Sequence, residues 1–149
     1  MRKLAFLAVF AGSFLGIGLS FLIVNEFESH LMSVHHVEAV TDLAASIRLL
    51  NELDSSASLA FGRLTILFFC GIVAGYITAT IAKRLGILAC LLASVLPLVA
   101  NAYLSHLSHP AAWLGWKLVS AAAVIGIPGW FALGGYIRVL QSRWRAWRQ

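Results

Sequence analysis

The chain has 149 residues, of which 60% are hydrophobic and 11% are charged. A soluble domain has about 45–50% apolar and 25% charged residues. This composition therefore excludes an ordinary soluble globular protein, and it is typical of a chain that crosses a membrane several times. The length leaves room for a single domain over residues 1–149.

Four apolar runs are each long enough to cross a bilayer as a helix. They cover residues 4–24, 64–82, 85–104 and 118–137, and none contains Asp, Glu, Lys, Arg or His. Each run of about 20 residues gives roughly 30 Å of helix, which matches the hydrocarbon core of a bilayer. Helices are expected because an open sheet would leave backbone polar groups unpaired in lipid. The sequence thus predicts an all-α integral membrane four-helix bundle.

The charges are sorted by segment, and this predicts an orientation. The six acids all lie between the first two apolar runs, whereas eight of the eleven bases lie near the N-terminus, between the second and third runs, or after the fourth. Because Lys and Arg are retained on the cytoplasmic side, we expect both termini inside and the loop of residues 25–63 outside. The short connections favour a bacterial inner membrane.

The outer loop carries a pattern of its own. From Val34 to about Asp54, apolar residues recur at helical spacing with acids between them, which predicts an extracytoplasmic amphipathic helix. Its acidic face disfavours adsorption to anionic lipid. We therefore expect its apolar stripe to dock on protein, through Val40, Leu43, Ile47 and Leu50.

Small residues recur every four positions in the first two runs. Gly12 and Gly16 form such a stripe in the first run, and Gly71 and Gly75 in the second. Such stripes let helix backbones approach closely in a membrane. They predict helix packing within the bundle or, alternatively, a homo-oligomer interface.

Two prolines lie near the middle of apolar runs. Pro97 and Pro128 cannot donate a backbone hydrogen bond, so the carbonyls of Ala93 and Val124 lose their helical partner. We therefore expect a kink at each proline. A transporter would show paired broken helices in two repeated halves of the sequence, and no such repeat is visible, so these kinks are expected to serve helix packing.

The C-terminal segment interleaves arginines with indoles. Arg143, Arg145 and Arg148 alternate with Trp144 and Trp147 directly after the fourth run. Although bases and aromatics also occur in nucleic-acid sites, this position favours an interfacial anchor. Indoles reside at headgroup depth, and each Arg near an anionic leaflet contributes about 1 kcal/mol.

The histidines form the one constellation with metal-binding chemistry. In the expected topology His35 and His36 share the outer face with His106 and His109. Imidazoles beside carboxylates suit zinc or copper, so a periplasm-facing metal-binding protein is an alternative. The competing interpretation is that these are solvated structural residues, because no HExxH or CxxC motif accompanies them.

Motifs for catalysis are missing from the sequence. It has no Gly-x-Ser-x-Gly, no P-loop and no ionisable group within a run, which disfavours pumps and proton-coupled transporters. Cys70 and Cys90 are predicted to lie too far apart for a disulfide. We expect a non-enzymatic accessory or assembly subunit of a membrane complex, with no cofactor or nucleic acid and with lipids and other membrane subunits or further copies as partners. A membrane immunity or exclusion protein is a second alternative.

Overall fold

The structure, a computed structural model, describes residues 2–34, 57–83, 86–108 and 114–148. This part of the chain forms four helices: α1 (Arg2–Val34), α3 (Ala57–Ala82), α4 (Gly86–Ser108) and α5 (Leu114–Trp147). Each contains a stretch long and apolar enough to span a membrane: residues 5–27, 61–82, 86–103 and 121–147 respectively. Within these described residues, the prediction of an all-helical protein with four apolar helices is confirmed. The predicted outer amphipathic helix lies outside the described residues.

Three of the helices are markedly longer than the predicted apolar runs. α1 continues ten residues past residue 24, α3 begins seven residues before residue 64, and α5 continues ten residues past residue 137. Hydropathy locates the apolar layer, whereas a helix ends only where its hydrogen-bonded ladder ends. Glu, Arg and Gln are good helix formers, so the polar flanks extend the helices beyond that layer.

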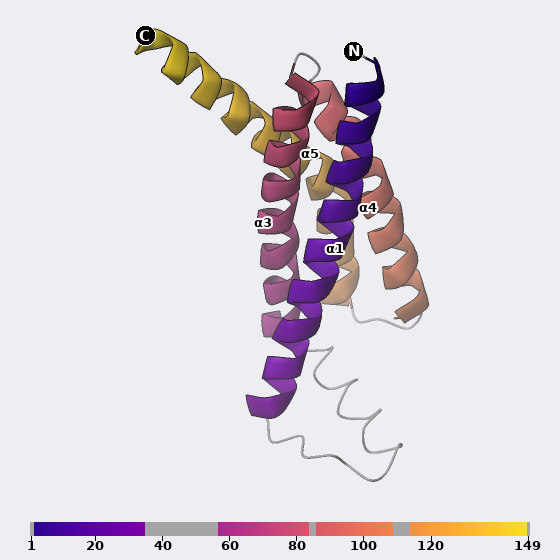
Figure 1. Cartoon of the computed structure of the whole chain (residues 1–149). Helices are drawn as coiled ribbons and strands as arrows, with labels where there is room; N and C mark the ends of the chain where they lie inside the picture. Colours follow the sequence, from indigo (N-terminus) through magenta and orange to yellow (C-terminus); the bar gives the residue numbers. More distant parts are fainter. Residues whose placement is uncertain (1, 35–56, 84–85, 109–113, 149) are drawn as a thin grey trace.

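The helices run alternately up and down the bundle, so α1 is parallel to α4 and antiparallel to α3 (Figure 1). α5 packs most extensively on α3 and also on α4, while α1 packs on α3 and α4. Both termini lie at the same end of the bundle. The C-terminal part of α5, in yellow, leaves the other helices and projects away from them.

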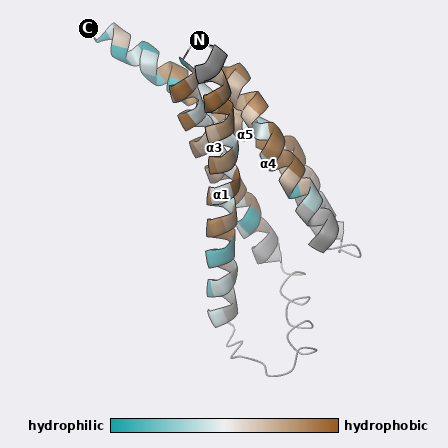
Figure 2. Ribbon diagram, turned by 45° about the vertical axis from the view of Figure 1, so that its right-hand side comes forward, coloured by the Kyte–Doolittle hydropathy of each residue, from teal (hydrophilic) through white to brown (hydrophobic). Residues whose placement is uncertain are grey.

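Apolar residues occupy the middle of the helices (Figure 2), and many of the large ones are exposed. Between 22% and 33% of each apolar stretch is buried within the protein, so most of these side chains meet the surroundings. On α1 the outward residues include Phe6, Phe10 and Phe14, whose rings follow one another with centroids 5.3 and 5.9 Å apart. An exterior of this kind is suited to lipid rather than to water.

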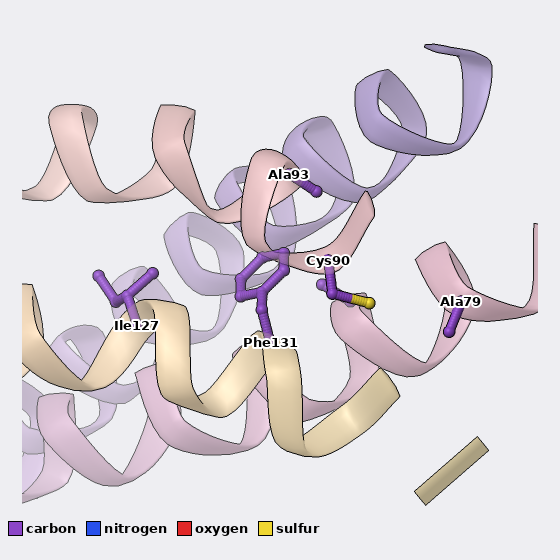
Figure 3. Close-up of a cluster of buried hydrophobic side chains, with 6 residues drawn as sticks. Ala79, Cys90, Ala93, Ile127 and Phe131 are labelled. Carbon is purple, nitrogen blue, oxygen red and sulfur yellow. The ribbon is translucent and has the colours of Figure 1, made fainter. Parts of the chain in front are cut away.

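Phe131 of α5 occupies the centre of the bundle and is 1% exposed. Figure 3 shows its ring pointing from α5 toward the turn of α4 that carries Ala93. Cys90 and Ile127 belong to the same cluster, and the other members are Ala74 and Ala79 of α3. A large aromatic side chain surrounded mainly by small ones lets the helices converge closely around it.

α3 ends in a tight turn at Lys83, which has a φ of 51°. This is the left-handed conformation that usually follows the last residue of a helix, where glycine is favoured because it has no Cβ. An exposed lysine occupies the position here. α4 then begins at Gly86, where an added Cβ would make ordinary van der Waals contact with Ala79 of α3.

Candidate functional site

A buried hydrogen bond joins α1 to α4 at the level of the proline in α4. The hydroxyl of Ser13 donates to the carbonyl oxygen of Ala93 over 2.8 Å. That carbonyl lies four residues before Pro97, which has no N–H to offer it. Ser13 therefore supplies from a neighbouring helix the hydrogen bond that the proline removes. α4 is one continuous helix through Pro97.

The two glycines of the α1 stripe face the interior of the bundle. A Cβ added at Gly12 would overlap the hydroxyl of Thr78 on α3 and approach the Cβ of Ala93 to 3.2 Å. A Cβ at Gly16 would lie 2.7 Å from the ring of Phe131 and 3.3 Å from Pro97. α1 can approach its neighbours at these levels because both positions lack a side chain.

Glycines also set the approach of α3 to α5, and here the opposing atoms belong to the backbone. A Cβ at Gly75 would overlap the carbonyl of Phe131, and one at Gly134 would overlap the carbonyl of Ile72. One turn away, a Cβ at Gly71 would lie 2.9 Å from the Cβ of Trp130. The two backbones are therefore in direct contact, and both helices contribute the glycines that allow it.

Cys90 of α4 packs beside this backbone contact between α3 and α5. Its Sγ lies 3.1 Å from the carbonyl oxygen of Gly75, to which the thiol donates. A Cβ at Gly135 would approach this sulfur to 2.8 Å, so the thiol fills the space between α3 and α5. Cys70 and Cys90 are both buried and free, which confirms the prediction that they do not pair.

Side-chain hydrogen bonds join α3 to α5 near the end of the bundle where the termini lie. The Nε–H of Arg138 donates to the hydroxyl of Thr80 over 3.1 Å, and that hydroxyl donates to the carbonyl of Tyr76 over 2.8 Å. The phenol of Tyr76 in turn donates to the side-chain oxygen of Gln141. These bonds hold the guanidinium of Arg138 at the edge of the bundle.

Asn101 is the described residue whose polar group is buried without a partner. Its Nδ2 makes no hydrogen bond, and it lies one turn beyond Pro97 on α4. On the parallel helix α1, Ser20 lies one turn beyond Gly16 and directs its hydroxyl to the carbonyls of Gly16 and Ile17. A buried amide nitrogen without a hydrogen-bond partner, such as Nδ2 of Asn101, costs folding free energy in an apolar layer unless water or a side chain reaches it.

The predicted metal ligands and docking residues fall where the structure describes little. His35, His36 and His109 lie outside the described residues, as do Val40, Leu43, Ile47 and Leu50. His106 belongs to α4, but its side chain is not among those described. Within the described part of the chain, no group of three or more His, Cys, Asp or Glu residues could hold a metal ion.

The interhelical donors are the residues that the sequence alone did not identify. The carbonyl of Ala93 was predicted to lose its partner, but Ser13 was not recognised as the new donor. The available signal was that Ser13 is one of two hydroxyl residues in residues 4–24, and a hydroxyl in an apolar layer needs an acceptor. The contact of Arg138 with Thr80 could not be anticipated, because it depends on the register of α5 against α3.

Comparison with protein families, with curated proteins and with solved structures finds no match to this chain. Its function must therefore be argued from its own residues. The described site is a set of close helix contacts with hydroxyls and a thiol bonded to main-chain carbonyls. Such an arrangement can hold helices in register, and it offers no activated nucleophile or general base.

Proposed function

We propose that this protein is a non-catalytic accessory or assembly subunit of a membrane complex. It spans a bacterial inner membrane with both termini in the cytoplasm. It binds its partner subunit through the outer segment, which is the loop of residues 25–63 between the first two spans. The supporting observation is the way in which buried polar groups are used. Ser13, Thr78 and Ser94 are buried, and each directs its hydroxyl to a main-chain carbonyl at 2.7 or 2.8 Å.

Each of these hydroxyls donates its hydrogen to the protein's own main chain, and that of Ser13 also links two helices. Ser13 replaces a hydrogen bond lost to proline, and the other two bond within their own helices. A bundle whose buried hydroxyls bond to its own main chain is suited to a scaffold that presents its outer surfaces to other molecules. This supports a binding role over an enzymatic one.

The proposed orientation combines the arrangement of the helices with the distribution of charge. Both termini lie at one end of the bundle, so one side of the membrane receives the N-terminal bases and those of α5 (Figure 1). Lys83 follows α3 at the same end. Retention of Lys and Arg on the cytoplasmic side favours this end as the inner one.

The partner-binding role is tested by adding charge to the apolar stripe of the outer segment. The double change Leu43→Glu with Ile47→Glu should abolish co-purification of the partner subunits while leaving membrane insertion intact. The matched control is Thr41→Glu with Ala45→Glu, which adds the same charge on the opposite side of a helix and should preserve co-purification. Equal recovery of partners by both variants would contradict the proposed docking surface.

The same preparation tests the metal-binding alternative. The accessory-subunit proposal expects less than one equivalent of zinc or copper by elemental analysis. Two results would favour a metal-binding protein instead. The protein would hold stoichiometric metal that is lost on His106→Ala, and the Leu43→Glu, Ile47→Glu variant would still recover its partners.

A further inference from the structure

The C-terminal part of α5 has the composition of a membrane-surface helix, and it lies apart from the bundle. Residues 138–148 comprise the end of α5 and Arg148 after it. Arg138 and Gln141 still bond to Thr80 and Tyr76 of α3, and beyond them the helix projects away from the other helices (Figure 1). We propose that this segment, the basic arm, lies on the cytoplasmic leaflet and binds the headgroups of anionic phospholipids. The choice of leaflet rests on the orientation proposed above, whereas the binding of anionic lipid does not.

The basic arm has one apolar stripe. Leu140, Trp144 and Trp147 lie at positions i, i+4 and i+7 of the helix, which places them on one face. The stripe continues the outward face of the bundle, because Leu133 is likewise exposed and lies seven residues before Leu140. Trp147 is 92% exposed and Trp144 is 68% exposed, so the described part of the chain leaves both indoles largely uncovered. Continuity with the face suited to lipid favours lipid as the occupant.

Arginines border this stripe on both sides. Arg143 and Arg148 flank the indoles along the helix, and the guanidinium carbon of Arg148 lies 5.7 Å from the centre of the Trp144 ring. A guanidinium at this distance from an indole is attracted to the face of the ring. Basic side chains beside tryptophans at a helix boundary are suited to phosphate headgroups with the rings inserted below them.

Arg138 and Arg145 share the opposite face, being seven residues apart. Arg138 is oriented by its Nε–H bond to Thr80, and this leaves the two terminal nitrogens of its guanidinium for an anion. Two parallel N–H groups match two oxygens of a phosphate. Arg138 thus provides a fixed phosphate-binding group where the basic arm leaves the bundle.

The charge of the basic arm favours a lipid surface over a protein partner as the molecule it binds. All six acids of the chain lie before α3, so α5 contains no carboxylate that would neutralise its arginines. The arm therefore presents only positive charge beside exposed indoles. An anionic leaflet meets both features at once, since it supplies phosphates above and acyl chains below.

The test measures lipid preference of the full-length protein in phosphatidylcholine proteoliposomes. Spin-labelled phosphatidylglycerol and spin-labelled phosphatidylcholine are compared by electron paramagnetic resonance for their association with the protein. The wild type should prefer the anionic probe by about threefold or more. The change Arg143→Gln, Arg145→Gln and Arg148→Gln should clearly reduce that preference, although Arg138 and the other bases at this end remain.

The matched control replaces the same three arginines by lysine, which keeps the charge and should keep most of the preference. For the wild type, raising the salt concentration from about 0.05 to 0.5 M should weaken the preference, since exposed charges are screened. This measurement requires no variant to fold. Three results would overturn the proposal: equal association of both probes with the wild type, an unchanged preference in the glutamine variant, and loss of a protein partner from that variant without any change in lipid preference.

Discussion

The hydroxyl of Ser13 lies 2.8 Å from the carbonyl oxygen of Ala93, the acceptor that Pro97 deprives of its helical hydrogen bond. A proline in the middle of an apolar helix leaves a polar group that water cannot reach. The bundle satisfies that group through a different helix. The pairing of α1 with α4 is therefore linked to the presence of the proline.

This relationship predicts an interaction between two substitutions. Ser13→Ala should destabilise the bundle by about 1 kcal/mol, because interhelical hydrogen bonds in membranes contribute roughly that much. In a Pro97→Ala background the new N–H can bond to Ala93, so the same change should cost markedly less. Unfolding of the four variants in mixed detergent micelles gives the coupling energy by a double-mutant cycle.

Ser20→Ala is the control for that cycle. Its hydroxyl bonds only to carbonyls of its own helix, at Gly16 and Ile17, so its removal should change stability little and should not depend on Pro97. A cost for Ser13→Ala that is the same with and without the proline would show that the two residues act independently.

The glycine contacts predict a position-dependent cost of a single methyl group. Gly75→Ala should destabilise the bundle by about 2 kcal/mol, because the new Cβ meets the main-chain carbonyl of Phe131 and a backbone cannot move aside cheaply. Gly129→Ala is the control, since a Cβ there meets nothing within 4 Å. Similar unfolding free energies for the two variants would mean that α3 and α5 are not in backbone contact.

A third comparison separates the interior of the bundle from its exterior. Phe131→Ala should cost about 3 kcal/mol, because it leaves a cavity among four helices. Phe14→Ala removes the same atoms from a side chain that is 63% exposed, and it should cost far less if that side chain faces lipid or detergent. Comparable losses in a thermal unfolding assay would place Phe14 in a protein interface, as expected for a homo-oligomer.

The four apolar helices could be predicted from the sequence because hydropathy records a strong constraint, namely the exclusion of charge from the bilayer core. The positions of the free carbonyl at Ala93 and of the glycine stripes also followed from local rules. Neither the missing N–H of a proline nor the spacing of glycines identifies which helix lies opposite these positions. That Gly75 faces the Phe131 carbonyl, and that Ser13 reaches Ala93, depends on the rotation and register of whole helices.

The helices extend beyond the predicted spans for a related reason. The prediction ended the first span at residue 24 and the last at residue 137, at the edge of the apolar composition. Backbone hydrogen bonding does not stop there, and α1 continues to Val34 and α5 to Trp147. As a consequence, the tryptophans of the C-terminal segment were expected as an anchor but not as one stripe of a continuing helix.

The turn after α3 predicts a gain in stability. Lys83 adopts a φ of 51°, where a Cβ costs about 1 kcal/mol relative to glycine. Lys83→Gly should therefore stabilise the bundle by about that amount when compared with Lys83→Ala. The alanine variant controls for loss of the charge. If the two variants unfold at the same detergent concentration, the left-handed turn does not carry this strain.

The orientation is tested by labelling introduced cysteines with a thiol reagent that does not cross membranes. With both termini in the cytoplasm, Ser56→Cys should be labelled in intact cells, whereas Ser142→Cys should be labelled only after lysis. Cys70 and Cys90 are buried, so the unsubstituted protein serves as the background control. The physical basis is the retention of the eight bases on the cytoplasmic side. Labelling in the opposite order would place the histidines and the outer segment in the cytoplasm, and it would move the basic arm to the other leaflet.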